Sequence, residues 1–328
     1  MSKTMRKLTY AGAICEAQCE EMARDDSVFV IGEDVDIAGG VYKLTCGIME
    51  KFGEKRLIGT PISEEAFCGM AVGAAMAGLR PIVEIMYIDF ILMAMDPVVN
   101  QMAKVQFMSG GQFKMPVTVR AQAGAGTAEA AQHSQSFEAW FAHTPGFKVC
   151  MPATVYDAKG LLKSAIRDDN PVLVIENRVL FFDEEEVPEG EWTVPLGKAD
   201  VAREGKDITI VATGIMRRKA LAAAKSLEGQ ISVEVIDPRT IVPLDLETIL
   251  ASVGKTGRLL VTHESPTRNG IGAEIVRRVV EEGFDYLNGP PRVVAGSDTP
   301  IPFSSALEKV ALPQEETIVK AVKEMVGG

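Results

Sequence analysis

Short apolar runs alternate with longer segments of helical character along the whole chain. In the first half, a continuous apolar run stands at 28–31, and mostly apolar segments stand at 81–86, 116–120, 148–150 and 171–175. Such runs are typical of strands that are buried on both faces of a parallel sheet. Between them, the spacing of apolar positions predicts helices over 9–24, from Glu64 to about Gly78, over 90–108 and over 154–166. This order predicts βαβ units and a mainly parallel sheet.

The alternation is interrupted once and then resumes. The segment 182–191 is acidic and carries Pro and Gly, so we expect an exposed stretch that leads to a domain boundary. Strands follow at 207–212, 232–236, 258–261 and 292–295, with helices over 216–227, 246–253, 272–282 and 315–325. The sequence therefore predicts an α/β protein with two doubly wound domains. The first covers 1–185, a linker covers 186–200, and the second covers 201–328.

Composition narrows the class of protein. The 328 residues are 47% hydrophobic and 24% charged, which is typical of a folded globular chain. The net charge of −11 argues against nucleic acid as a main partner, because phosphate backbones require a basic surface. The longest apolar run, 66–79, is shorter than the roughly 18–20 residues that span a bilayer, so we expect no membrane insertion. The five cysteines are scattered without a C-x-x-C pair, which favours a reducing compartment and a cytoplasmic protein.

Few residues draw attention as candidate chemistry. The chain has no P-loop, no G-x-S-x-G and no H-E-x-x-H motif. Glu64 and Glu65 begin a helix just after a strand, where parallel sheets collect ligands, but acids at a helix start also simply complement the helix dipole. The residues alone favour the second explanation. Of the three histidines, His133 is the best candidate for a substrate contact, because it follows a Gly-rich stretch in a polar loop.

Many short motifs, taken in order, resemble one family. They are Gly59-Thr-Pro-Ile-Ser-Glu64 with the Gly- and Ala-rich segment 69–78, and then Tyr87-Ile-Asp-Phe90, Met108-Ser-Gly-Gly111, Ala131-Gln-His-Ser-Gln135, Ala142-His-Thr-Pro-Gly146, Val235-Ile-Asp-Pro-Arg-Thr240, His263-Glu264 and Asp298-Thr-Pro-Ile-Pro302. Together they resemble the beta subunit of the decarboxylating component of 2-oxo acid dehydrogenase complexes. Pyruvate, branched-chain and acetoin dehydrogenases have such subunits. The resemblance implies a transketolase-like fold and thiamine diphosphate as cofactor.

The resemblance also implies roles for individual residues. Glu64 matches the glutamate that hydrogen-bonds the N1′ nitrogen of the cofactor's aminopyrimidine and favours the tautomer that acts as the base. A carboxyl group in a largely apolar pocket holds its proton more readily, which suits this role. Phe90 matches the aromatic residue that stacks on the aminopyrimidine, and Ile62 matches an apolar contact to it. His133 matches the histidine that faces the substrate, and Glu33 matches an acid near the pocket.

One expected motif is absent. Relatives that bind the diphosphate through magnesium carry Gly-Asp-Gly followed by Asn, and the chain contains no Gly-Asp-Gly. The resemblance therefore implies an alpha subunit that holds Mg²⁺, in an α2β2 assembly with the active site shared, and a lipoyl acyltransferase core that accepts the acyl group. Some relatives also hold a potassium ion, and the matching positions here are Val117, Thr118, Ala165, Asp168 and Asn170.

Three functions are open on this basis. The first is a 2-oxo acid or acetoin dehydrogenase beta subunit, whose small-molecule substrate the sequence does not select. The second is a split transketolase-type subunit, which transfers a ketol unit and needs no lipoyl partner. The third is a non-catalytic assembly subunit that has kept the fold. The presence of Glu64 and His133 argues against the third.

Overall fold

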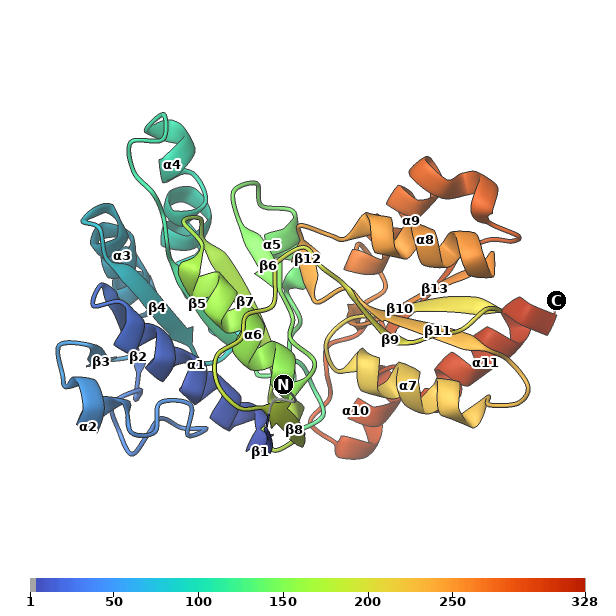
Figure 1. Cartoon of the computed structure of the whole chain (residues 1–328), viewed down its shortest axis with the longest axis horizontal. Coiled ribbons are helices and arrows are strands. Elements are labelled where there is room, and N and C mark those ends of the chain that lie inside the picture. The colour runs from blue at the N-terminus through green and yellow to red at the C-terminus, as the bar shows by residue number, and fades with distance from the viewer. Residues whose placement is uncertain (1–3, 328) are drawn as a thin grey trace. The chain divides into compact units, whose positions relative to one another are not determined.

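The computed structural model describes residues 4–327, and these form two compact units (Figure 1). The first unit contains the chain up to Ala123 together with Trp140–Leu196. The second contains Gly124–Ala139 and the chain from Gly197 onward. The segment Gly124–Ala139 thus packs with residues that come much later in the sequence. Compactness alone defines these units, so the domain limits 1–185 and 201–328 stay a proposal.

Six parallel strands form the sheet of the first unit, in the order β6-β7-β5-β4-β2-β3. Their bounds are β2 (Val28–Glu33), β3 (Leu57–Thr60), β4 (Arg80–Ile85), β5 (Thr118–Ala123), β6 (Lys148–Cys150) and β7 (Val172–Asn177). All six residues of β5 and all six of β7 are buried. Continuous burial is why these strands appear in the sequence as apolar runs without alternation.

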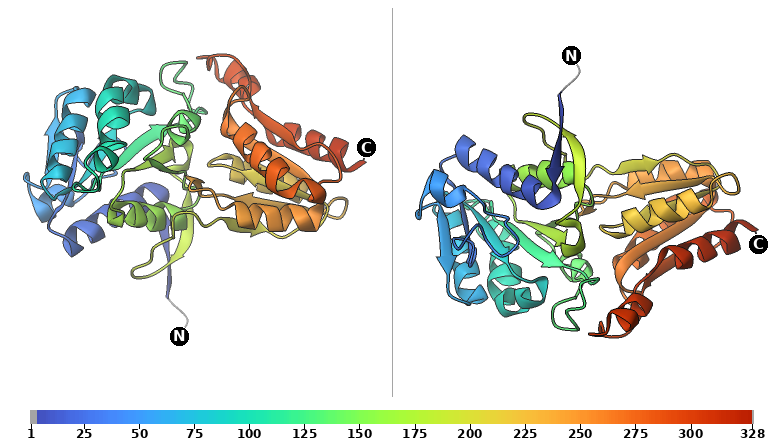
Figure 2. Two further views of the ribbon diagram at one scale, coloured as in Figure 1. Left: turned by 90° about the horizontal axis from the view of Figure 1, so that it is seen from above. Right: turned by 90° about the horizontal axis from the view of Figure 1, so that it is seen from below.

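Helices cover both faces of this sheet. Figure 2 shows α1 (Tyr10–Arg24) and α6 (Val155–Arg167) on one face, and α3 (Glu64–Met76) on the other. Two short helices, α2 (Ile48–Phe52) and α5 (Glu138–Ala142), and a turn, η3 (Arg178–Leu180), lie in the connections. Thr154 caps α6 by accepting a hydrogen bond from the Asp157 N–H at 3.0 Å, as its position before the apolar pattern predicts.

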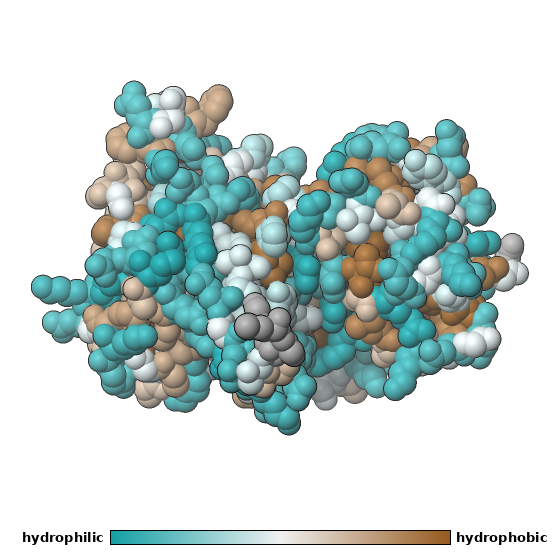
Figure 3. All heavy atoms as spheres, viewed as in Figure 1, coloured by the Kyte–Doolittle hydropathy of each residue, from teal (hydrophilic) through white to brown (hydrophobic). Residues whose placement is uncertain are grey.

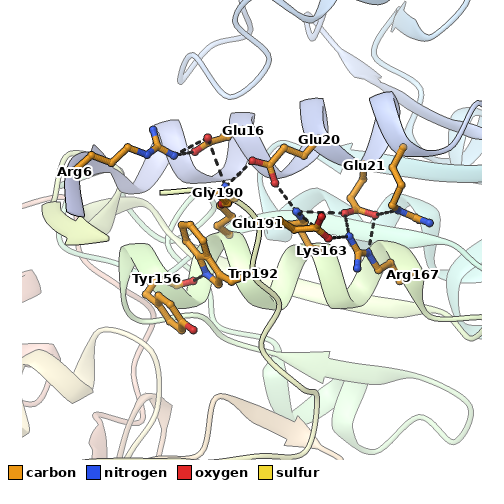
Figure 4. A network of polar contacts seen from close by, with 12 residues as sticks. Arg6, Glu16, Glu20, Glu21, Tyr156, Lys163, Arg167, Gly190, Glu191 and Trp192 are labelled. Atoms are coloured by element: carbon orange, nitrogen blue, oxygen red, sulfur yellow. Dashed lines mark hydrogen bonds and ion pairs between the residues drawn. The ribbon is translucent and has the colours of Figure 1, made fainter. Parts of the chain in front are cut away.

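Helices α1 and α6 are joined by a row of ion pairs (Figure 4). The ammonium group of Lys163 is almost fully buried and pairs with the carboxylates of Glu20 and Glu21 on α1. One turn further along α6, the Arg167 guanidinium pairs with Glu21 at 2.6 Å. Buried charges are stable only when they are paired and hydrogen-bonded. These pairs therefore fix α1 against α6 as well as neutralising the lysine.

The segment 182–191 is mostly exposed, as predicted, but part of it forms a strand instead of an irregular connection. Strand β8 (Glu184–Pro188) pairs antiparallel with β1 (Met5–Thr9), and Lys7 forms an ion pair with Glu184 at 3.2 Å. Just beyond β8, Trp192 is buried and its ring N–H donates to the Tyr156 carbonyl at 3.0 Å (Figure 4). An acidic strand needs a partner that local sequence does not reveal, and here the partner lies near the start of the chain.

The prediction of one long helix over 90–108 was wrong. The segment is broken into a 3₁₀ turn, η1 (Ile88–Ala94), a π-helical turn, η2 (Asp96–Met102), and a short helix, α4 (Val105–Met108). Pro97 explains the first break, because it has no N–H to donate to the preceding turn. The Asp96 carboxylate accepts hydrogen bonds from the side chains of Asn100 at 2.9 Å and Gln101 at 2.8 Å, which starts the next turn.

The second unit is a smaller α/β domain with strand order β14-β13-β10-β11-β9. Strand β9 (Asp200–Arg203) runs antiparallel to β11 (Val233–Asp237), and the pairs among β10 (Ile208–Ala212), β11, β13 (Leu259–Pro266) and β14 (Arg292–Gly296) are parallel. A short strand, β12 (Thr240–Val242), and a 3₁₀ turn, η4 (Phe284–Tyr286), lie in the connections. The mainly parallel sheets of both units confirm the predicted α/β class.

Helices cover the two faces of the second sheet as well. Figure 1 shows α8 (Leu246–Thr256) and α9 (Ile271–Gly283) on one face, and α7 (Met216–Ser226) and α11 (Glu315–Gly327) on the other. The short helix α10 (Ser305–Ala311), which the sequence pattern did not predict, precedes α11. The face of the molecule seen in Figure 3 is mostly hydrophilic, with hydrophobic residues gathered in separate patches.

Candidate functional site

Two glutamates meet at the carboxyl edge of the first sheet. Strands β2 and β3 are parallel neighbours, and their register places Glu33 opposite Thr60 at the end of each strand. The chain leaves β3 through Pro61, Ile62 and Ser63 and enters α3 at Glu64. Parallel strands end at the same edge of a sheet, so Glu33 and Glu64 come together although 30 residues separate them.

The Glu33 carboxyl group lies in a partly buried and electrostatically unfavourable environment. It accepts a hydrogen bond from the backbone N–H of Ser63, yet its Oε1 atom is buried without a hydrogen-bond partner among the residues that the structure describes. Burial, and then the nearby charge of Glu64, raise the pKa of Glu33 to about 7. Glu64 itself is buried, with 7% of its surface exposed. A buried oxygen without a partner is rare in folded proteins and marks a place where a ligand atom can bind.

Two glycines lie close to neighbouring groups at this edge. A Cβ atom on Gly59 would lie 2.0 Å from the Asp36 carboxylate, and one on Gly32 would lie 2.7 Å from the Glu84 carbonyl oxygen. The Asp36 side chain is exposed and can move away, but the Glu84 carbonyl belongs to the neighbouring strand and cannot. Gly32 is therefore the glycine that the close approach of β2 and β4 next to Glu33 requires.

Apolar and aromatic side chains lie in the segments next to α3. Ile62 lies in the connection before α3 and is 84% exposed, which is unusual for an isoleucine. Phe90 is half-buried on η1, a turn that packs against both α3 and β4. Tyr87 precedes this turn, and its hydroxyl accepts a hydrogen bond from Tyr42 at 2.8 Å. The Tyr42 contact comes from a distant loop and carries no signal in the sequence.

His133 lies in the second unit, in the segment Gly124–Ala139. The ends of its loop are joined by a hydrogen bond from the Gly124 N–H to the Gln135 carbonyl at 3.1 Å. His133 is half-buried, whereas the neighbouring Ser134 is buried. The Gly124–Gln135 hydrogen bond closes the loop, and the buried Ser134 fixes the backbone next to His133.

The residues predicted to hold potassium already have partners. The carbonyl of Val117 accepts the Val172 N–H at 3.0 Å, and that of Ala165 accepts the Asp168 N–H at 3.2 Å. The Asp168 carboxylate accepts two hydrogen bonds from Asn170, each at 2.9 Å. The ammonium group of Lys148 pairs with its other oxygen. Lys148 thus already pairs its positive charge with Asp168, the single carboxylate among the five residues predicted to hold potassium.

Two kinds of feature are missing from the part of the chain that the structure describes. Within residues 4–327, no three His, Cys, Asp or Glu side chains are grouped so that they could bind a metal ion together. In the same range, every helix is too short or too polar to span a lipid bilayer.

Comparisons with known proteins agree with this architecture. Residues 6–182 match the family described as "Transketolase, pyrimidine binding domain", and residues 197–318 match "Transketolase, C-terminal domain". Among solved structures, a chain described as "Split gene transketolase, inactive beta4 tetramer" superposes with a TM-score of 0.78, covering 98% of both chains at 24% identity. The chain is thus a two-domain protein of the transketolase fold.

Curated relatives define the family more narrowly. The chain is 49% identical to the pyruvate dehydrogenase E1 component subunit beta of Rickettsia felis, over 97% of this chain and 98% of that protein. It is 48% identical to the same subunit of Rhizobium meliloti over 97% of this chain and 70% of the relative. For the mitochondrial beta-2 subunit of Oryza sativa the identity is 46%, over 98% and 87%. The chain belongs to the family of pyruvate dehydrogenase E1 component beta subunits, which favours the dehydrogenase function over a split transketolase.

Proposed function

We propose that this chain supplies the aminopyrimidine half of a thiamine diphosphate site in a 2-oxo acid dehydrogenase. The observation that carries the proposal is the pair Glu33 and Glu64 at the carboxyl edge of the sheet, with one buried Glu33 oxygen free to accept a hydrogen bond. The residues present fit the group, because a buried and a half-buried acid beside apolar side chains suit a flat ring with basic nitrogens. When bound, thiamine diphosphate supplies the electron sink that lets a C–C bond next to a carbonyl break.

Each side chain of the pair has a defined task in this proposal. Glu64 hydrogen-bonds the N1′ nitrogen of the aminopyrimidine through its buried carboxyl group. Glu33 lies beside Glu64 and provides a second carboxyl group at the edge of the site, whose pKa is raised to about 7. Ile62 and Phe90 exclude water from the ring, and Phe90 is placed on η1 to stack on it. His133 holds or donates a proton near the substrate carbonyl.

The partner subunit follows from what the chain lacks. The sequence contains no Gly-Asp-Gly motif, so we assign the magnesium–diphosphate half to an alpha subunit in an α2β2 assembly. The relatives' name, subunit beta of an E1 component, supports such a partnership. The acyl group would pass to lipoyl-lysine of an acyltransferase core, in the cytoplasm.

A potassium ion at Val117, Thr118, Ala165, Asp168 and Asn170 is a separate proposal, and it requires the ion pair of Lys148 with Asp168 to open.

Pyruvate is the first substrate to test, because the relatives are named pyruvate dehydrogenase components. Branched-chain 2-oxo acids and acetoin are the alternatives, since the alpha subunit would contribute part of the acyl pocket. The chain should be co-expressed with a cognate alpha subunit, and reduction of an artificial electron-accepting dye measured over a panel of these substrates. Substrate-dependent reduction that requires both subunits, thiamine diphosphate and Mg²⁺ supports the proposal. Ketol transfer between sugar phosphates instead would favour the split transketolase.

A binding measurement tests the shared site separately. Thiamine diphosphate with Mg²⁺ is titrated into the isolated chain and into the reconstituted complex by calorimetry. We expect binding to the complex and at least 100-fold weaker binding to the isolated chain. Tight binding by the isolated chain would contradict the division of the site between two subunits.

A further inference from the structure

The loop that carries His133 adopts a backbone conformation that its own residues do not favour. Ala128 has a φ of 56° and Ala130 a φ of 63°, both in the left-handed region that alanine rarely occupies. Each such residue costs about 1–3 kcal/mol unless its surroundings fix it. Something outside the loop must therefore hold this conformation in place.

Two carboxylates from late in the chain do so. The Glu308 Oε1 accepts a hydrogen bond from the Gly126 N–H at 2.8 Å, and its Oε2 accepts one from the Ala128 N–H at 3.1 Å. The Glu264 Oε1 accepts the Ala125 N–H at 2.9 Å. Glu308 lies on α10, 182 positions after Gly126, and is 3% exposed. Hydrogen bonds from backbone N–H groups to a buried carboxylate are charge-assisted and stronger than neutral ones.

These contacts hold one side of the loop, and burial holds the other. After His133, Ser134 is 2% exposed and Phe137 is 6% exposed. His133 therefore lies between a segment fixed by Glu308 and a segment fixed in the core. Its own N–H donates to the Ala130 carbonyl at 3.4 Å, so the left-handed residue is directly linked to the histidine.

We propose that Glu308, assisted by Glu264, is a positioning residue for His133. The carboxylates fix the strained backbone at 125–128 and thereby set the direction from which the histidine side chain leaves the loop. Glu308 would then act through the backbone of the loop without contacting substrate or cofactor. The role given to His133 rests on the proposed function, whereas the hydrogen bonds that hold its loop do not.

The test compares Glu308→Gln and Glu308→Ala with a matched control, Glu316→Gln, in the reconstituted complex. Glu316 is an exposed glutamate on the following helix, α11. The first readout is hydrogen–deuterium exchange, followed by mass spectrometry of the peptide that covers 124–139. We expect exchange there to be at least 10-fold faster in Glu308→Ala, with peptides of α11 unchanged. Exchange equal to that of Glu316→Gln would overturn the proposal, whatever reaction the complex performs.

The second readout asks whether Glu308 acts through His133. Turnover is measured for Glu308→Ala, His133→Ala and the double variant. A positioning residue has no further effect once its target is gone, so we expect kcat to fall about 10–100-fold in Glu308→Ala, with KM changed less than 3-fold, and the double variant to match His133→Ala. Losses that multiply in the double variant would show that Glu308 acts elsewhere and would overturn the inference. Glu308→Gln, which keeps the shape of the side chain, provides the comparison if the alanine variant assembles poorly.

Discussion

Replacing Glu33 by glutamine removes an acid that the folded chain holds in an unfavourable place. In the folded protein the pKa of Glu33 is raised to about 7, first by burial and then by the charge of Glu64, from an ordinary value of 4.5. Between these two values the folded chain binds a proton that the unfolded chain has released. Stability therefore falls as pH rises through this window, and the full penalty is present above pH 7. Glu33→Gln removes the penalty, so it should stabilise the protein at alkaline pH.

The size of the effect follows from the same values. A difference of about 2.5 pH units corresponds to about 3 kcal/mol for a fully buried group. Glu33 is only half-buried, so solvent screening reduces the penalty to about 1–2 kcal/mol. For a domain of this size that is a rise in Tm of about 2–8 °C.

The assay is urea unfolding of wild type and variant at pH 5.0 and pH 8.0. We expect Glu33→Gln to exceed wild type by about 1–2 kcal/mol at pH 8.0 and by much less at pH 5.0. Glu65→Gln is the control, because Glu65 is the exposed neighbour of Glu64 and should give no pH-dependent gain. A gain that is equal at both pH values, or a loss at pH 8.0, would refute the electrostatic account of this edge.

Two further predictions concern groups outside the site. Arg120 is fully buried and pairs with Glu84 at 2.6 Å and Glu176 at 2.7 Å, so Arg120→Met should leave two carboxylates uncompensated in the core. We expect a loss of about 3–5 kcal/mol in urea unfolding, and a loss below 1 kcal/mol would contradict the buried pairing. A hydrogen bond from the Cys15 thiol lowers the pKa of Cys19 to about 7, so alkylation of Cys19 by iodoacetamide should rise with a midpoint near pH 7. A midpoint above pH 8.5, or one that Cys15→Ala leaves unchanged, would be inconsistent with that hydrogen bond.

The sequence predicted those parts of the fold that depend on local pattern. Apolar runs such as 28–31 and 171–175 lie in strands because both faces of the sheet are covered, so no alternation is needed. The helix start at Thr154 was equally predictable, because a capping side chain bonds its own helix. Features that depend on distant partners were not predictable. Strand β8 exists because β1 pairs with it, and local sequence contains no trace of that pairing.

The residues of the proposed site also fall into two groups: those that nearby sequence indicates, and those that depend on distant partners. Glu64 alone looked like an ordinary acid at a helix start, and its importance came from the surrounding motifs. The raised pKa of Glu33 depends on burial and on Glu64, which only the register of β2 and β3 brings near. The contact of Glu308 with the loop of His133 joins residues 182 positions apart and could not be inferred from either segment. Sequence reasoning proposed the acids and the histidine as site residues, but it did not indicate the groups that contact them.

The central claim is that Glu64 activates the cofactor in a shared active site. The most direct test is turnover of the reconstituted complex with Glu64→Gln beside Glu65→Gln, because the two glutamates are adjacent and only Glu64 is buried. We predict that Glu64→Gln lowers kcat by about 10²–10⁴-fold while the complex still assembles, and that Glu65→Gln stays within 2-fold of wild type. Unchanged turnover in Glu64→Gln would contradict the account and favour a subunit that serves assembly alone.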